Sequence, residues 1–68
     1  MKSVSEKEFV SFVKNYPEKL HVQTDFAADP PVIIYKTRRD EIVAKSYEWE
    51  LAKRPKRKED VDYEIKPR

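Results

Sequence analysis

The clearest structural signal in this chain is the segment Val4-Ser5-Glu6-Lys7-Glu8-Phe9-Val10-Ser11-Phe12-Val13-Lys14-Asn15-Tyr16-Pro17. Ser5 and Glu8 have the spacing of a capping box, in which each side chain satisfies a free backbone N–H at the start of a helix. Four large apolar residues then recur at helical spacing and define one face: Phe9, Phe12, Val13 and Tyr16. Pro17 disfavours helical geometry at the residue before it. The sequence therefore predicts a helix over about residues 5–16.

Beyond this helix the apolar residues alternate with polar ones, which is the period of a β-strand. Two prolines, Pro30 and Pro31, interrupt the alternation, since proline cannot donate a hydrogen bond to a sheet. The strands are predicted at about 20–26, 32–36, 41–51 and 61–65. Short connections favour antiparallel neighbours. The predicted fold is α+β, with one N-terminal helix packed on a four-stranded antiparallel sheet.

The chain has 68 residues, which is enough for a single small domain over 1–68. A core of this size is marginal, and the chain has no cysteine to form a disulfide. The predicted core contains Phe9, Phe12, Val13, Tyr16, Leu20, Val22, Phe26, Trp49 and part of Val32–Tyr35. With no glycine in the chain, a turn that needs a positive φ must use Asn, Asp or a strained residue.

Apolar runs in the sequence are short, and residues 1–20 contain no apolar stretch resembling a signal peptide. The longest run, Val32-Ile33-Ile34-Tyr35, is far too short to span a bilayer. The sequence therefore predicts a soluble protein that does not bind membranes. Together with the absence of cysteine, this favours a cytoplasmic location.

The same apolar run is the first candidate binding site. A helix is about 10 Å wide, whereas four strands at about 4.8 Å each span nearly twice that. Because Val32, Ile33, Ile34 and Tyr35 are apolar on both faces of their strand, one pair must point away from the helix. A partner protein or a second copy of the chain can cover it; incidental exposure of an isoleucine or tyrosine is the alternative.

A second candidate site lies in the predicted loop 52–60, where Lys53-Arg54-Pro55-Lys56-Arg57-Lys58 carries five positive charges. Such a loop, joined by Arg38 and Arg39, could contact nucleic-acid phosphates through charge alone. Six nearby carboxylates could instead pair with it and make it purely structural: Glu48, Glu50, Glu59, Asp60, Asp62 and Glu64. The net charge of the whole chain is only +2.

Residues for catalysis are scarce. His21 is the single histidine and is expected on the polar side of a strand, and no spacing brings a serine and a carboxylate to it. One histidine and no cysteine leave only carboxylates as metal ligands, without the spacing of a calcium loop. A chain without glycine has no P-loop and no dinucleotide fingerprint. No enzymatic activity, metal or cofactor is predicted.

Several ordered pieces resemble small uncharacterised proteins of phages and prophages of Gram-positive bacteria. The resemblance covers roughly residues 1–47 and rests on Ser5-Glu6-Lys7-Glu8-Phe9, Phe12, Tyr16-Pro17, Leu20, Pro30-Pro31, Tyr35 and Ile42-Val43-Ala44-Lys45. It implies a phage accessory protein that works in the cytoplasm of a bacterial host and carries over no catalytic or binding residue. We therefore expect a non-enzymatic accessory protein that binds a host or phage protein or its own copy. Nucleic-acid binding through residues 53–58 is the alternative.

Overall fold

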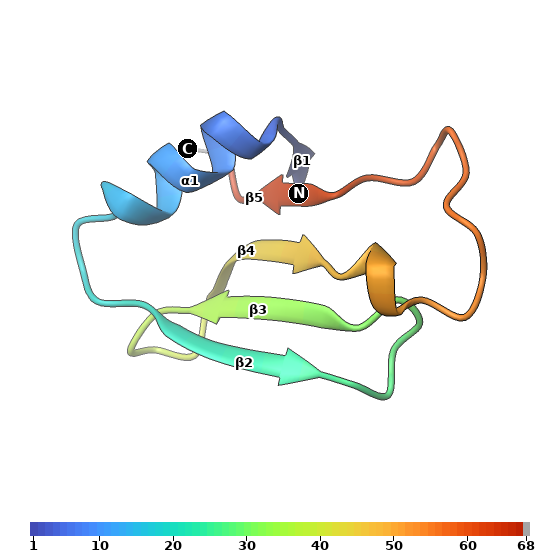
Figure 1. Ribbon diagram of the computed structural model, residues 1–68. Coiled ribbons are helices and arrows are strands. Elements are labelled where there is room, and N and C mark those ends of the chain that lie inside the picture. The colour runs from blue at the N-terminus through green and yellow to red at the C-terminus, as the bar shows by residue number, and fades with distance from the viewer. Residues whose placement is uncertain (68) are drawn as a thin grey trace.

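The computed structural model describes residues 1–67, over which one helix accompanies a five-stranded antiparallel sheet (Figure 1). The elements in chain order are β1 (Lys2–Ser3), α1 (Glu6–Lys14), β2 (His21–Asp25), β3 (Val32–Lys36), β4 (Ile42–Tyr47), a short 3-10 helix η1 (Trp49–Leu51) and β5 (Tyr63–Ile65). In space the strands follow the order β1-β5-β4-β3-β2. The α+β prediction is confirmed, and the additional strand is the two-residue β1.

Helix α1 begins as the sequence predicts. The backbone N–H of Glu8 donates to Ser5 Oγ at 3.2 Å, so the serine caps the first turn. Glu6 and Glu8 lie in that turn, where negative charge complements the positive end of the helix dipole. The regular helix ends at Lys14, and Asn15 forms its C-cap. The predicted end near Tyr16 is therefore two residues too late.

The predicted strand over 41–51 is too long. β4 ends at Tyr47, and the chain then turns through η1. Two contacts hold this turn: the Glu48 N–H donates to the carbonyl of Pro31, and the Trp49 indole Nε1–H donates to the carbonyl of Val61 at 2.8 Å. The last strand is also shorter than predicted and starts at Tyr63.

A register shift between β3 and β4 sets the centre of the core. Tyr35 lies opposite Ala44, but the next residue, Lys36, lies opposite Ile42, so Val43 is an extra residue in the ladder. A bulge of this kind redirects side chains locally. Val43 and Ala44 are consecutive, yet both are buried, with 1% and 0% of their surface exposed. The alternation expected of a regular strand fails here.

The predicted core is correct in its helical part and wrong at β2. Phe9 is buried, and Phe12, Val13, Tyr16, Leu20 and Trp49 are half-buried. Val22 and Phe26, predicted to be buried, are 61% and 74% exposed. These residues are exposed because α1 packs mainly against β5, which lies near the opposite edge of the sheet from β2 (Figure 1).

The turn between β3 and β4 supplies the one positive φ found among residues 1–67, at Asp40 with φ 65°. Aspartate tolerates this left-handed conformation better than most residues, which fits the expectation for a chain without glycine. The buried Thr37 organises the turn, because its Oγ1 accepts hydrogen bonds from the N–H groups of Arg39 and Glu41.

Candidate functional site

Over residues 1–67 the single α-helix lies on one face of the sheet, so no α-helix covers the opposite face. Residues directly opposite each other in the ladder share a face, so the register assigns both sides. Phe9 of the helix packs on Tyr35 and Tyr63, which identifies their side as the helix side. The opposite side, called the open face below, carries four apolar residues of the central strands: Val32, Ile34, Ile42 and Tyr47.

The predicted site at Val32–Tyr35 is therefore divided by the sheet. Ile33 and Tyr35 point toward the helix side, where the ring of Tyr35 meets Phe9 edge-on at 5.4 Å between ring centroids. Val32 and Ile34 lie on the open face and are only half-buried. Ile42 and Tyr47 join them from β4 and were not predicted as site residues. Their place depends on the register, which a sequence pattern does not specify across a bulge.

Polar side chains lie among and beside these apolar residues, and Lys45 is directly opposite Ile34. Lys45 lies opposite Glu64, and Lys36 forms an ion pair with Asp40 at 3.3 Å. The Tyr47 hydroxyl donates to Glu64 Oε1. Burial, followed by this hydrogen bond and the charge of Glu64, raises the pKa of Tyr47 to about 12. The Tyr47 phenol therefore stays neutral at ordinary pH, and its hydroxyl donates a hydrogen bond to Glu64 on the same face.

The basic loop is tied down by its own acidic neighbours. Arg54 forms a bidentate pair with Asp60, at 2.9 and 3.2 Å, and its guanidinium lies over the Trp49 ring, 4.7 Å from the centroid. The Arg57 backbone N–H also donates to Asp60 Oδ2 at 2.8 Å. The pair with Arg54 and the bond from Arg57 lower the pKa of Asp60 to about 2.

A second ion pair in this region joins Lys56 to Asp62 at 2.8 Å. The loop is also anchored from outside, since the Lys53 backbone N–H donates to Asp29 Oδ1 at 2.8 Å. Among residues 1–67, the side chains of Lys53, Arg57 and Lys58 form no ion pair. Two of the five predicted cationic contacts are thus engaged within the protein.

Arg38 and Arg39 do not join the basic loop. Both lie in the turn between β3 and β4, whereas loop 52–60 lies beyond the far end of β4 (Figure 1). The length of β4, six residues at about 3.4 Å each, separates the two groups by roughly 20 Å. The suggestion of one basic patch that combines them is therefore wrong, because a hairpin places its turn and its open end at opposite ends.

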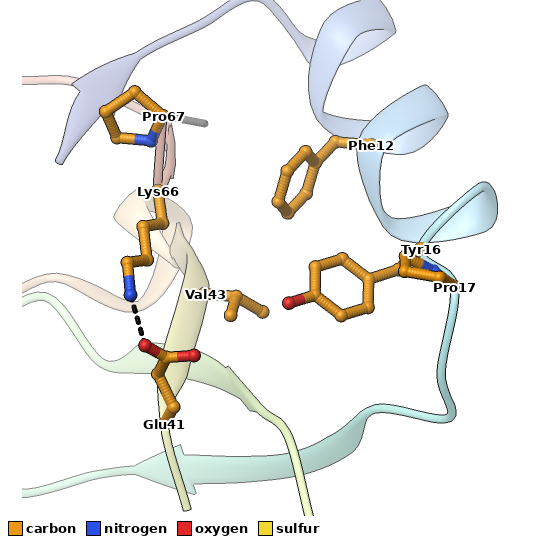
Figure 2. A pocket seen from close by; sticks show the side chains of 7 residues that line it. All are labelled: Phe12, Tyr16, Pro17, Glu41, Val43, Lys66 and Pro67. Carbon is orange, nitrogen blue, oxygen red and sulfur yellow. Dashed lines mark hydrogen bonds and ion pairs between the residues drawn. The ribbon is translucent and has the colours of Figure 1, made fainter.

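A cleft of about 320 Å³ opens between the end of α1 and the sheet (Figure 2). Phe12, Tyr16 and Pro17 line its helix side, and Val43 forms its floor. Glu41 and Lys66 form an ion pair across its other side. The rings of Phe12 and Tyr16 pack edge-on at 5.5 Å, so this cleft is the incompletely filled end of the core. Its polar lining residues are Tyr16 and the paired Glu41 and Lys66.

Candidate catalytic groups remain separate from one another. His21 is exposed on the edge strand β2, as predicted for a polar strand position. Ser5 caps the helix, Ser11 accepts a hydrogen bond from Asn15, and Ser46 is buried in β4. Within residues 1–67, no three His, Cys, Asp or Glu side chains are grouped so that they could hold a metal ion.

Comparison with models of protein families, with curated proteins and with solved structures gives no match. Over residues 1–67, no helix has the length and apolar character needed to cross a membrane. The candidate binding surfaces of residues 1–67 are therefore the open face and the basic loop.

Proposed function

We propose that this chain is a non-enzymatic protein-binding module, of the accessory type found in phages and prophages, whose partner is a host or phage protein or a second copy. The observation that carries the proposal is the open face, where Val32, Ile34, Ile42 and Tyr47 share a side of the sheet that no α-helix of residues 1–67 covers. All four are half-buried within the chain, so a partner would remove their remaining apolar surface from water. Burial of such surface contributes roughly 25 cal/mol per Å².

The arrangement of this face resembles the anatomy of a protein interface. It combines four apolar side chains, one of them aromatic, with the charged side chains of Lys36, Lys45 and Glu64. Lys45 lies within the face, opposite Ile34 on one side and Glu64 on the other. Tyr47 is a favourable central residue, because a tyrosine offers a large contact area at a low cost in side-chain entropy. A small domain with a marginal core also gains stability from association.

The phage part of the proposal rests on the resemblance over roughly residues 1–47. Its pieces include Ile42-Val43-Ala44-Lys45, which forms most of β4, and Tyr16-Pro17 at the end of the helix. The resemblance therefore concerns elements that build the fold. We place the protein in the cytoplasm of a bacterial host on this basis.

The test compares partner capture by matched variants. Ile34→Lys replaces an apolar side chain of the open face by a second positive charge opposite Lys45, and Val10→Lys places the same charge on the 52%-exposed outer side of α1. We expect the original chain and Val10→Lys to retain the same specific protein from a Gram-positive bacterial lysate and Ile34→Lys to lose it. Circular dichroism and thermal unfolding establish that both variants fold. Equal capture by all three proteins would refute the role of the open face.

Nucleic-acid binding is the second candidate, and one observation favours it. Lys53, Arg57 and Lys58 form no ion pair within residues 1–67, so three exposed cations remain in the basic loop. Against this, Arg54 and Lys56 are engaged with Asp60 and Asp62. The support for this function is therefore weaker than for protein binding.

A further inference from the structure

The two edges of the sheet differ greatly. One edge is β1, which has only two residues and so offers little backbone for pairing. The other is β2, which has five residues and pairs only with β3. Four of these five residues are exposed, and Val22 remains 61% exposed although it lies on the helix side. The β2 edge thus presents a full row of backbone groups beside exposed apolar surface.

This edge lacks the devices that usually prevent pairing. Natural edge strands carry prolines, bulges or lysines that obstruct an incoming strand. β2, His21-Val22-Gln23-Thr24-Asp25, has no proline and no lysine, and its register with β3 is regular. Its ionisable residues are one basic and one acidic side chain, placed symmetrically about Gln23. An isolated strand edge of this composition is suited to receive a strand.

We propose that β2 pairs in antiparallel fashion with β2 of a second copy, about a two-fold axis at Gln23; this rests on the proposed protein-binding function and names one partner. In that register His21 lies opposite Asp25 of the other copy, twice, so that an imidazole N–H can donate a hydrogen bond to a carboxylate. Val22 lies opposite Thr24, which pairs two β-branched residues. Just outside the strand, Leu20 lies opposite the 74%-exposed Phe26. The sequence of the strand is therefore complementary to itself.

Other symmetric registers fit less well. Residues directly opposite each other share a face, so a two-fold antiparallel pair must be centred on a residue and not between two residues. A centre at Val22 leaves Thr24 and Asp25 opposite Leu20 and Lys19, outside the strand. A centre at Thr24 leaves His21 opposite Ala27, beyond the end of β2. Only the centre at Gln23 pairs all five strand residues and places both histidines opposite aspartates.

The dimer would extend the open face. A two-fold axis perpendicular to the sheet keeps each face on its own side. Two five-stranded sheets then form one sheet of ten strands, with both helices on one side and both open faces on the other. His21, Gln23 and Asp25 of each copy lie on the open side and would form the seam. A partner of the open face would thus meet a continuous surface built from two copies.

Cysteine cross-linking tests the register directly, because the natural chain has no cysteine. In Gln23→Cys, the two introduced thiols would lie opposite each other, with Cα atoms about 4.5–5.5 Å apart, which suits a disulfide. In Val22→Cys, on the same edge, the distance between the two copies would be about 8 Å, which is too long. We expect rapid oxidation of Gln23→Cys to a covalent dimer and little cross-linking of Val22→Cys. Val10→Cys, on the exposed side of α1, measures cross-linking by random collision.

Sedimentation equilibrium supplies the second test, without any covalent bond. We expect the original chain to form a dimer of twice its 8.2 kDa mass at high concentration. Gln23→Lys and Gln23→Glu each place like charges opposite each other and should weaken the dimer about fivefold. Their equimolar mixture should associate more tightly than either alone, because opposite charges then meet on the axis.

Two results would overturn the inference: a chain that stays monomeric at high concentration, or equal cross-linking of Val22→Cys and Gln23→Cys. Neither would touch the proposed function if Ile34→Lys still abolishes capture of a partner. Conversely, failure of capture with a confirmed dimer would leave the pairing of β2 intact. The two proposals can therefore fail separately.

Discussion

The ring of Phe9 lies 4.7 Å from the ring of Tyr63, with an angle of 32° between the two planes. The same phenylalanine meets Tyr35 edge-on from the other side. One helical side chain therefore joins α1 to both β5 and β3, and β4 lies between these two strands in the sheet. Because Phe9 is the one buried side chain of α1, this contact does most to hold the helix on the sheet.

Phe9→Ala should remove about 3–5 kcal/mol of unfolding free energy, most of what so small a domain has. Phe12→Ala should cost less, roughly 1–2 kcal/mol, because its ring is half-exposed and lines the cleft at the end of α1. Urea denaturation of both variants measures the difference. Equal losses would contradict the central place of Phe9 in the contact between α1 and the sheet.

The helix and the strand positions could be predicted from the sequence, because their causes are local. Ser5 satisfies the backbone three residues away, and Pro17 stops the helix through its own ring. The alternation in β2 and the interruption at Pro30-Pro31 are likewise properties of neighbouring residues. Because the chain has no glycine, the sequence predicted that a turn with a positive φ would use Asn, Asp or a strained residue, and Asp40 occupies that position.

The parts that the sequence did not predict depend on contacts between distant residues. Val43 becomes buried because the register shifts against Tyr35 and Lys36, and no pattern within β4 records that shift. Phe26 looks like a core residue from its period, yet it is exposed because α1 lies over β5 instead. Ile42 and Tyr47 reach the open face only through the same register. To predict that Ile42 and Tyr47 lie on the open face, one would need to know which residues of β3 pair with which residues of β4.

The pair of Arg54 with Asp60 predicts a loss of stability in acid. The pKa of this carboxyl falls from 3.8 to about 2 in the folded protein. A lowered pKa stabilises the fold fully above 3.8, and this contribution is lost as the pH falls from 3.8 toward about 2. Unfolding free energy measured across this range should fall more steeply in the original chain than in Asp60→Asn. A parallel fall in both proteins would show that Asp60 is not the group responsible.

Tyr47 predicts the opposite behaviour in alkali. Its pKa rises from 10.0 to about 12, so the fold favours the neutral phenol. That stabilisation is complete below pH 10.0 and is lost as the pH rises from 10.0 to about 12. Tyr47→Phe should show a smaller alkaline loss of unfolding free energy. Some loss should remain, because the pKa values of Tyr35 and Tyr63 are raised as well.

Absorbance of tyrosinate during an alkaline titration gives an independent check on Tyr47. In Tyr47→Phe, the rise in tyrosinate absorbance near pH 12 should be lost, and the rise at lower pH should be unchanged. Glu64→Gln, which removes the neighbouring charge, should move the titration of Tyr47 toward its ordinary pKa. If the curve of Glu64→Gln matched that of the original chain, the charge of Glu64 would not be a cause of the shift.

The dependence of oligonucleotide binding on salt distinguishes a structural basic loop from a nucleic-acid site. Each phosphate contact contributes about −0.9 to the slope of log affinity against log salt on duplex DNA. Five contacts from the loop would give about −4.5, whereas the three cations without ion pairs would give about −2.7. We expect only weak binding, with a slope no steeper than the second value, because Arg54 and Lys56 are held by Asp60 and Asp62.

Variants of the basic loop complete this test by fluorescence anisotropy with single- and double-stranded oligonucleotides. Reversing the charges of Lys53, Arg57 and Lys58 should abolish whatever binding remains and change stability by under about 0.5 kcal/mol, since these side chains are exposed. Reversal of Arg38 and Arg39 is the matched control at the other end of the sheet and should leave binding unchanged. A slope near −4.5 would mean that both ion pairs open to contact phosphates, and the protein-binding function would then yield to the nucleic-acid alternative.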